Sequence, residues 1–133
     1  MIERSLRLAL VLSLVPAAAG AVGLGPLSKS GITDGAAKAF YLTLSNPYPT
    51  MERFHANSLM TDSELDPGRV IIFPSRVALG PGGHRQLLII VRGLAPGEHF
   101  RFRVCAGRDP KPEEIVYARV CSTLTARRLP ARA

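Results

Sequence analysis

The stretch that decides the fold is residues 69–92, RVIIFPSRVALGPGGHRQLLIIVR. Two apolar runs are separated here by Pro74 and by the glycine-rich segment Gly80–Gly83. Short apolar runs bounded by proline and glycine are typical of β-strands, and the glycine-rich segment predicts a turn. We therefore expect strands over residues 69–73 and 85–92. The second is apolar on both faces, which indicates a strand in the middle of a sheet.

The rest of the chain continues this alternation of apolar runs and turns. Every second residue is apolar over Phe40–Leu44 and over Phe100–Val104, and a period of two predicts strands with one buried face. Further strands are therefore expected over residues 36–45, 51–60, 99–105 and 114–124, with a short continuation at Val77 and Leu79. Residues 51–60 alternate more weakly, so a short helix is the alternative there. Residues 23–35 are rich in Gly, Pro and Ser and can hold at most a broken edge strand.

About seven short strands, with turns about every 8–12 residues and no amphipathic helix, predict an all-β fold and a β-sandwich. The chain has 133 residues, 47% of them hydrophobic and 20% charged, which is the size and composition of one globular domain. We expect that domain over residues 22–126, followed by a basic tail at 127–133.

The first 21 residues predict a cleavable signal peptide. Arg4 and Arg7 precede the apolar run Leu8–Val15, and small residues at 17–21 follow Pro16. This order is typical of a secretory leader, with cleavage after Ala19 or Ala21. The alternative is a membrane anchor, but a spanning helix needs about 20 apolar residues, so stable membrane insertion is not expected. The chain is therefore expected outside the cytoplasm.

The formal charge of the chain is +7, of which the leader contributes +1. Such a charge attracts nucleic acid, anionic lipid or acidic proteins. Arginine outnumbers lysine 14 to 3, and the arginines of the mature chain are spread from Arg53 to Arg132 without a dense run. This spread suggests codon bias, and an exported protein rarely meets nucleic acid, so no nucleic-acid partner is expected.

The two cysteines, Cys105 and Cys121, are expected to form a disulfide, because an even count in an oxidising compartment favours pairing. On consecutive antiparallel strands they can face each other, since their midpoint falls beside the turn at Pro110–Pro112. Such a bond would contribute on the order of 3 kcal/mol. The alternative is two buried free thiols.

The sequence gives little sign of catalysis, and we expect neither an enzyme nor a cofactor. His55, His84 and His99 have no metal-ligand spacing, and there is no Cys-x-x-Cys or Gly-x-Ser-x-Gly motif. The acidic pair Glu113-Glu114 sits at a loop end, where a solvated rim is the expected role. No glycine-rich segment leads from a strand into a helix to hold a phosphate.

The order of these motifs resembles the N-terminal immunoglobulin-like domain of periplasmic pilus-assembly chaperones, the PapD-like family. Like that family, the chain has a proline-bearing strand, a hydrophobic step into Leu-x-Pro-Gly and a long apolar strand, at Ile72–Pro74, Val77–Gly82 and Leu87–Val91. Phe40–Asn46 is similar to the family's second strand, and residues 100–108 and 115–124 to its sixth and seventh. The resemblance implies a seven-stranded immunoglobulin-like β-sandwich in the periplasm.

The resemblance also implies a function. In this family the seventh strand is added to a pilus subunit that lacks its last strand, before an outer-membrane usher assembles the pilus. The side chains that would enter the subunit are Ile115 and Tyr117, or Val116, Ala118 and Val120 on the other face. The family also anchors the subunit's carboxylate with two basic residues, for which Lys29 and Arg119 are the nearest candidates.

The chain departs from the family in two respects. The usual chaperone has a second domain, and the loop Gly107–Glu113 is shorter and more polar than the family's. The first hypothesis is therefore a chaperone-like module that binds pilus or other surface subunits, with a possible homo-oligomer. The alternative is a structural or adhesive immunoglobulin-like surface protein, or a pilus subunit without chaperone activity.

Overall fold

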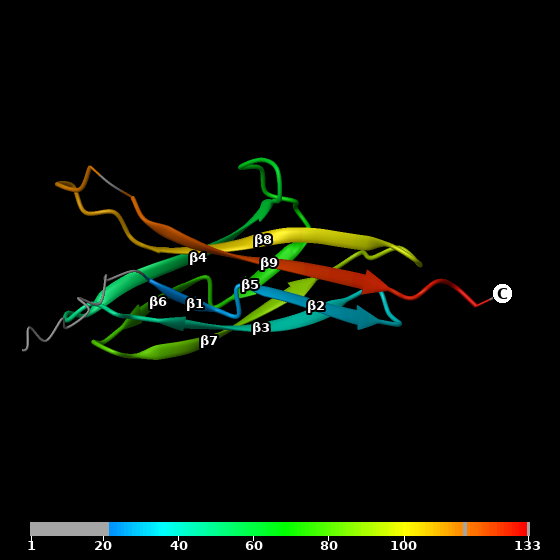
Figure 1. The fold of residues 1–133 in the computed structure, drawn as a ribbon, viewed down its shortest axis with the longest axis horizontal. Coiled ribbons are helices and arrows are strands. Elements are labelled where there is room, and N and C mark those ends of the chain that lie inside the picture. The colour runs from blue at the N-terminus through cyan, green and yellow to red at the C-terminus, as the bar shows by residue number, and fades with distance from the viewer. Residues whose placement is uncertain (1–21, 116, 133) are drawn as a thin grey trace, which may run out of the picture.

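In a computed structural model that describes residues 22–115 and 117–132, nine β-strands form two sheets that face each other (Figure 1). The strands are β1 (Gly23–Gly25), β2 (Ser28–Thr33), β3 (Lys38–Ser45), β4 (Glu52–Met60), β5 (Val70–Phe73), β6 (Arg76–Leu79), β7 (His84–Val91), β8 (His99–Arg108) and β9 (Arg119–Arg128). The four-stranded sheet has the order β1-β3-β7-β5, and the five-stranded sheet has the order β2-β9-β8-β4-β6. The predicted all-β sandwich is confirmed.

The described residues contain no helix, and hence none that could span a membrane. The predicted signal peptide, residues 1–21, lies outside the described residues.

Strand β7 is central, as its two apolar faces predict. It lies between β3 and β5 and is antiparallel to both. Leu87, Ile89 and Val91 on its inner face are fully buried. Residues 51–60 form the strand β4 and not the alternative helix, because alternate side chains of this segment face the core.

The first strand is split between the two sheets. β1 pairs with β3 at the edge of the four-stranded sheet, whereas β2 pairs in parallel with β9 at the edge of the five-stranded sheet. Pro26 and Leu27 form the crossing, and proline has no N–H with which to continue a ladder. The prediction of a broken edge strand over residues 23–35 is therefore confirmed.

The core lies between the inner faces of the two sheets and is built around phenylalanines. Phe102 of β8 is fully buried, lies edge-on to Phe40 of β3 at 6.4 Å between ring centroids, and stacks on Phe100 at 5.2 Å. Apolar residues from both sheets complete the cluster, including Leu42, Leu44, Phe54, Leu87, Ile89, Val91, Val104 and Leu124. The sandwich is therefore one continuous core.

A buried asparagine joins two turns at one end of the sandwich. The side-chain Nδ2 of Asn46 donates to the carbonyl oxygens of Leu79 at 2.8 Å, Gly80 at 3.0 Å and Thr50 at 3.0 Å. Its Oδ1 accepts the backbone N–H of Tyr48 at 2.9 Å. Asn46 therefore follows the end of β3 and also holds the β3–β4 loop against the β6–β7 turn.

The prediction for the last strand is wrong at both ends: β9 covers residues 119–128, not 114–124. The loop after β8 contains Pro110 and Pro112 and closes a turn in which Glu114 N–H donates to Lys111 O, so pairing starts later. At the other end, β2 supplies hydrogen-bonding partners as far as Arg128, and residues 127–128, expected in the tail, belong to the strand. β8 is correspondingly longer than expected and ends at Arg108.

Candidate functional site

One half of β9 has an open edge. β2 pairs only with residues 123–128 of β9. Over Arg119–Ser122, β9 pairs with β8 on one side, and no described strand pairs with its other side. The neighbouring β1 hydrogen-bonds to β3 in the other sheet (Figure 1), so it does not take this place.

The backbone of this half-strand points hydrogen-bonding groups away from β8. Thr123 N–H donates to Leu27 O at 2.9 Å, on the side of β2. Because orientation alternates along a strand, the N–H and C=O groups of Cys121 and Arg119 point to the same side. The Cα atoms of Cys121 and Cys105 are 4.0 Å apart. In an antiparallel ladder, facing residues this close do not hydrogen-bond to each other, so the backbone groups of Cys121 point away from β8. The edge therefore offers an incoming strand two donors and two acceptors.

The predicted disulfide between Cys105 and Cys121 is confirmed and lies beside this edge. The two residues are direct partners across β8 and β9. Their side chains lie on the outer face of the five-stranded sheet, because their neighbours Val104 and Ser122 face the core. The bond fixes the register of the half-strand, so the edge is held rigidly.

A loop carboxylate covers the outer face next to the edge. Arg119 donates hydrogen bonds of 2.7 Å to both carboxylate oxygens of Glu64, which belongs to the loop between β4 and β5. Arg103 of β8 also lies 3.5 Å from this carboxylate and donates to Met60 O and Ser63 O at 3.0 Å. The hydrogen bonds from Arg119 are the main reason that the pKa of Glu64 falls from 4.5 to about 2. The loop is thus tied to β8 and β9.

The loop between β8 and β9 folds back over β4 and β8. Tyr117 stacks on His55 with 5.9 Å between ring centroids, and its hydroxyl lies 2.5 Å from His55 Nε2. His55 Nδ1 lies 2.8 Å from the carboxylate of Asp109 at the other end of the loop. Gly107 makes room for Tyr117, since a Cβ there would lie 2.8 Å from the Tyr117 hydroxyl oxygen. Burial of Tyr117 raises its pKa above 10.0.

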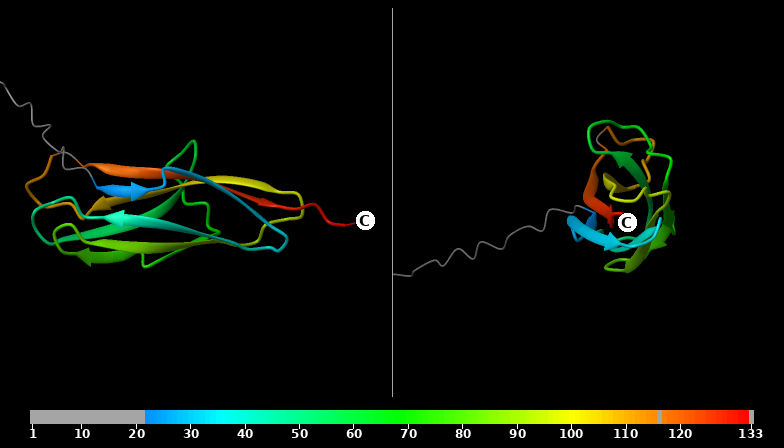
Figure 2. Two further views of the ribbon diagram at one scale, coloured as in Figure 1. Left: turned by 60° about the horizontal axis from the view of Figure 1, so that its bottom comes forward. Right: turned by 90° about the vertical axis from the view of Figure 1, so that its right-hand side faces the viewer.

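The predicted strand-donating residues do not alternate along one strand. Ile115 is fully exposed, and Tyr117 and Ala118 are also exposed, but all three lie in the loop before β9. Val120 is the member of the set that belongs to β9, and it packs against the domain's own core. Val116 lies outside the described residues. Ile115 therefore presents a fully exposed apolar side chain to solvent. The loop between β8 and β9 lies at one end of the sandwich (Figure 2).

Lys29 and Arg119 are not brought together. Lys29 pairs with Leu124, five residues along β9 from Arg119, a separation of roughly 16 Å. The two side chains also point to opposite faces, because Leu124 faces the core and Arg119 shares the outer face with Cys121. A single carboxylate cannot reach both basic groups in this arrangement, so an anchoring role remains a prediction for each residue separately.

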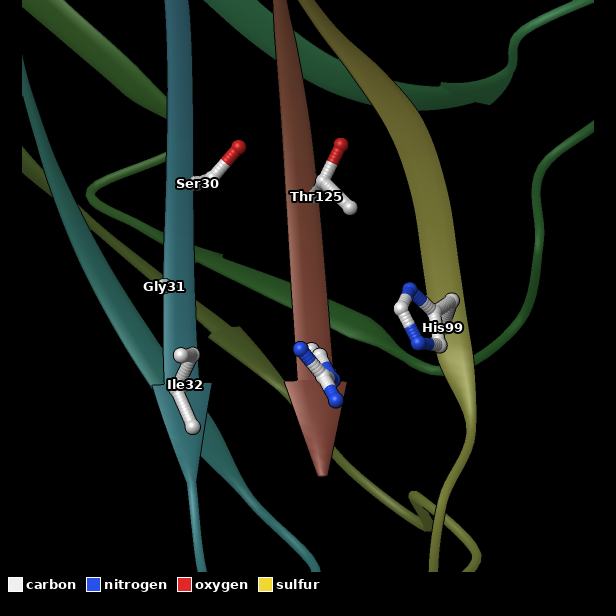
Figure 3. A pocket seen from close by; sticks show the side chains of 6 residues that line it. Ser30, Gly31, Ile32, His99 and Thr125 are labelled. Carbon is white, nitrogen blue, oxygen red and sulfur yellow. The ribbon is translucent and has the colours of Figure 1, made fainter. Parts of the chain in front are cut away.

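A shallow cavity of about 500 Å³ lies at the other end of β9, on the same outer face (Figure 3). Its lining residues come from β2, β8 and β9 and are Ser30, Gly31, Ile32, His99, Thr125 and Arg127. The described residues contain no group of three or more His, Cys, Asp or Glu side chains that could hold a metal ion.

Sequence analysis missed the roles of His55, Glu64 and Asp109. Glu64 lies 55 residues from Arg119 in the sequence, and His55 lies 54 from Asp109. Each contact depends on the pairing of β4 or its following loop with β8 and β9, and no local pattern predicts that register. The local signal that could have been used was His55 itself, which lies between the apolar residues Phe54 and Ala56.

Comparison with known proteins places the fold. No protein family and no curated protein matches the sequence. The solved structures with similar folds include the E. coli chaperone DraB (TM-score 0.66, 17% identity), the Salmonella enterica SafA pilin in complex with the SafB chaperone (0.67, 19%) and PapD-like domain 7 of human CEP192 (0.67, 15%). The match covers 85% of this chain and 57% of the matched chain in each of the first two, and 98% and 100% for CEP192. At these identities the likeness shows the fold, an immunoglobulin-like sandwich of the PapD-like type. The chain spans little more than half the length of the chaperones.

Proposed function

We propose that this protein is a periplasmic chaperone-like module, without catalytic activity, that binds pilus or other surface subunits by β-strand addition. The open edge of β9 over Arg119–Ser122 is the observation that carries the proposal, because it offers unpaired backbone groups beside a rigid, disulfide-bonded hairpin. The SafA–SafB structure supports it, since in that complex a chaperone of similar fold holds a pilin. The periplasmic location is part of the proposal and is supported by the predicted signal peptide.

In this proposal, the subunit strand lies beside the open half of β9. Backbone hydrogen bonds to Arg119 and Cys121 would supply affinity, and the exposed side chain of Ile115 would enter a pocket of the subunit. The guanidinium of Arg119 would bind a carboxylate of the subunit once Glu64 has moved away, and Lys29 would act separately on the other side of the edge. An outer-membrane usher would be the acceptor of the loaded subunit.

The test distinguishes the contribution of the backbone at the open edge of β9 from that of the Arg119 side chain. The chain is co-expressed in the periplasm with pilus subunits encoded beside its gene, and capture of a subunit is measured. Arg119→Pro removes an outward-pointing N–H and is expected to abolish capture, whereas Arg119→Ala keeps the N–H and is expected only to weaken it. Equal capture by wild type and Arg119→Pro would contradict strand addition at this edge.

A second function is favoured by one observation. The PapD-like domain of CEP192 matches this chain over nearly the whole length of both, so this fold also occurs as a domain of a protein other than a pilus chaperone. The chain would then be a structural or adhesive surface module. In that case no subunit is captured with either variant, and wild type and both variants behave alike.

A further inference from the structure

The outer face of the four-stranded sheet carries two rows of apolar side chains. In each row a residue of β7 lies between a partner on β3 and one on β5. The first row contains the larger residues and the second the smaller: Tyr41, Leu88 and Phe73, then Ala39, Ile90 and Ile71. Tyr41 is 50% exposed, Phe73 66% and Ile71 41%. We call these six residues the apolar face.

The composition of the apolar face is unusual for a solvated sheet. Antiparallel sheets normally turn polar residues to water, and the outer face of the five-stranded sheet does so with Arg101, Arg103, Thr123 and Thr125. Leu88 and Ile90 in the middle of the apolar face are half-buried, and the four residues of β3 and β5 beside them are exposed. Strand β7 is apolar on both sides, and the sandwich covers only the side that carries Leu87, Ile89 and Val91. A contiguous apolar patch of this kind marks an interaction surface.

We propose that the apolar face packs against the same face of a second copy of this chain, with the strands of the two copies antiparallel. A two-fold axis that crosses the strands between the rows places the larger row of one copy over the smaller row of the other. Tyr41 then lies over Ala39 of the second copy, and Leu88 lies over Ile90. The large Tyr41 therefore meets the small Ala39, and each contact occurs twice, as the two-fold symmetry of an isologous interface requires.

The polar margins of the face favour the same arrangement. Arg92 follows Ile90 on the outer side of β7, and Gln86 and Thr43 form the row beyond Leu88. The proposed axis places the Arg92 guanidinium over the oxygens of Gln86 and Thr43 of the second copy. The two Arg92 residues are then about 20 Å apart, well beyond the screening length of about 8 Å. A parallel arrangement would instead set Arg92 against Arg92 and the aromatic row against itself.

The area of the sheet indicates how stable the proposed dimer can be. The four strands β1, β3, β7 and β5 contain 3, 8, 8 and 4 residues. At about 4.8 Å between strands and about 3.4 Å for each residue, the sheet has a projected area of about 380 Å² for each copy. This is below the roughly 800 Å² that each partner buries in a standard stable interface, so the dimer is a weak and transient one. The dimer is therefore expected to exchange with the monomer and to be measurable at high protein concentration.

The main test is sedimentation of the exported chain from about 10 µM to about 1 mM, with variants that add a charge to one face at a time. The wild type is expected to approach twice the monomer mass. Leu88→Arg and Tyr41→Arg are expected to remain monomeric with unchanged melting temperature, whereas Met51→Arg, at a residue 70% exposed outside the face, is expected to behave as wild type. A wild type that stays monomeric, or a Leu88→Arg variant that still dimerises, would overturn the proposal.

Cross-linking between cysteine variants tests how the two copies are aligned, and it does not depend on the behaviour of a single variant. Ala39→Cys mixed with Tyr41→Cys is expected to form a cross-linked heterodimer several times faster than Ala39→Cys mixed with Thr43→Cys. Equal rates would overturn the antiparallel arrangement. Wild type that stays monomeric but binds vesicles of anionic phospholipid through Leu88 would show that lipid, not a second copy, covers the face. None of these results depends on the edge of β9, which belongs to the other sheet.

Discussion

Arg119 holds both carboxylate oxygens of Glu64 at 2.7 Å, so the one arginine beside the open half-strand is occupied by a carboxylate from the protein's own β4–β5 loop. The planar fork of a guanidinium matches a carboxylate, and the same geometry would suit a carboxylate of a bound subunit. An internal and an external carboxylate cannot use this fork together. The contact therefore sets two expectations, one for the free protein and one for binding.

In the free protein, Arg119→Gln is expected to raise the pKa of Glu64 from about 2 towards 4.5, because it removes both hydrogen bonds. In the wild type, the stabilisation from this pair is complete above pH about 4.5 and is lost as the pH falls through about 2. NMR titration of the side-chain carboxyls measures both values. Glu98, whose pKa is lowered to about 2 chiefly by Arg69, is the internal control and should not change.

For binding, Glu64→Gln is expected to strengthen the capture of a subunit peptide that ends in a free carboxylate, because the competing charge is gone. Exposed ion pairs of this kind have modest strength, so the expected gain is roughly two- to fivefold. Calorimetric titration measures it, with the amidated form of the same peptide as the control. An equal gain for the amidated peptide would show that Arg119 does not bind the carboxylate.

Loss of the disulfide should lower the stability of the whole domain. Cys105 and Cys121 are 16 residues apart, and closing a loop of that size stabilises a fold by about 3 kcal/mol. The double variant Cys105→Ala/Cys121→Ala is therefore expected to lose about 3 kcal/mol of unfolding free energy in urea. Reduction of the wild type should cause a similar loss, and an unchanged midpoint in both experiments would contradict the expectation.

Replacement of Asn46 should also be costly, although it touches no proposed binding surface. Asn46→Ala leaves three carbonyl oxygens without their donor at a buried position, which is expected to cost about 2–3 kcal/mol. The matched control is Asn57→Ala on the exposed side of β4, where the expected change is below about 0.5 kcal/mol. Equal stability of the two variants would show that Asn46 does not join the turns.

Gly107→Ala should displace the loop between β8 and β9. A Cβ at this position would lie 2.8 Å from the Tyr117 hydroxyl oxygen and 3.1 Å from the carbonyl oxygen of Ala118. The expected result is loss of the stacking between Tyr117 and His55, seen as a change in the ring-current shifts of His55. Gly80→Ala, where an added Cβ meets nothing within 4 Å, is the control and should leave these shifts unchanged.

The local pattern of apolar residues predicted most of the strands. A strand with one buried face has an apolar residue at every second position, and this pattern can be read without knowing which strands pair. It predicted β3 and β7, and the even count of two cysteines in an expected oxidising compartment predicted the pairing of Cys105 with Cys121. The local pattern ended β9 too early, because the last residues of this strand pair with β2, which is distant in sequence. The resemblance named Lys29 and Arg119 as candidates for holding one carboxylate, and the structure does not bring the two side chains together, because they lie on opposite faces of the sheet.

The parallel pairing of β2 with β9 has a consequence for how the protein folds. Ser28 pairs with Thr123, so the first strand of the five-stranded sheet finds its partner only after nearly the whole chain has been synthesised. Closing so long a loop is slow, and contacts between distant segments form late in folding. The domain cannot be completed from its N-terminus while synthesis continues. The five-stranded sheet can therefore gain its outermost strand, β2, only after the residues of β9 have been synthesised.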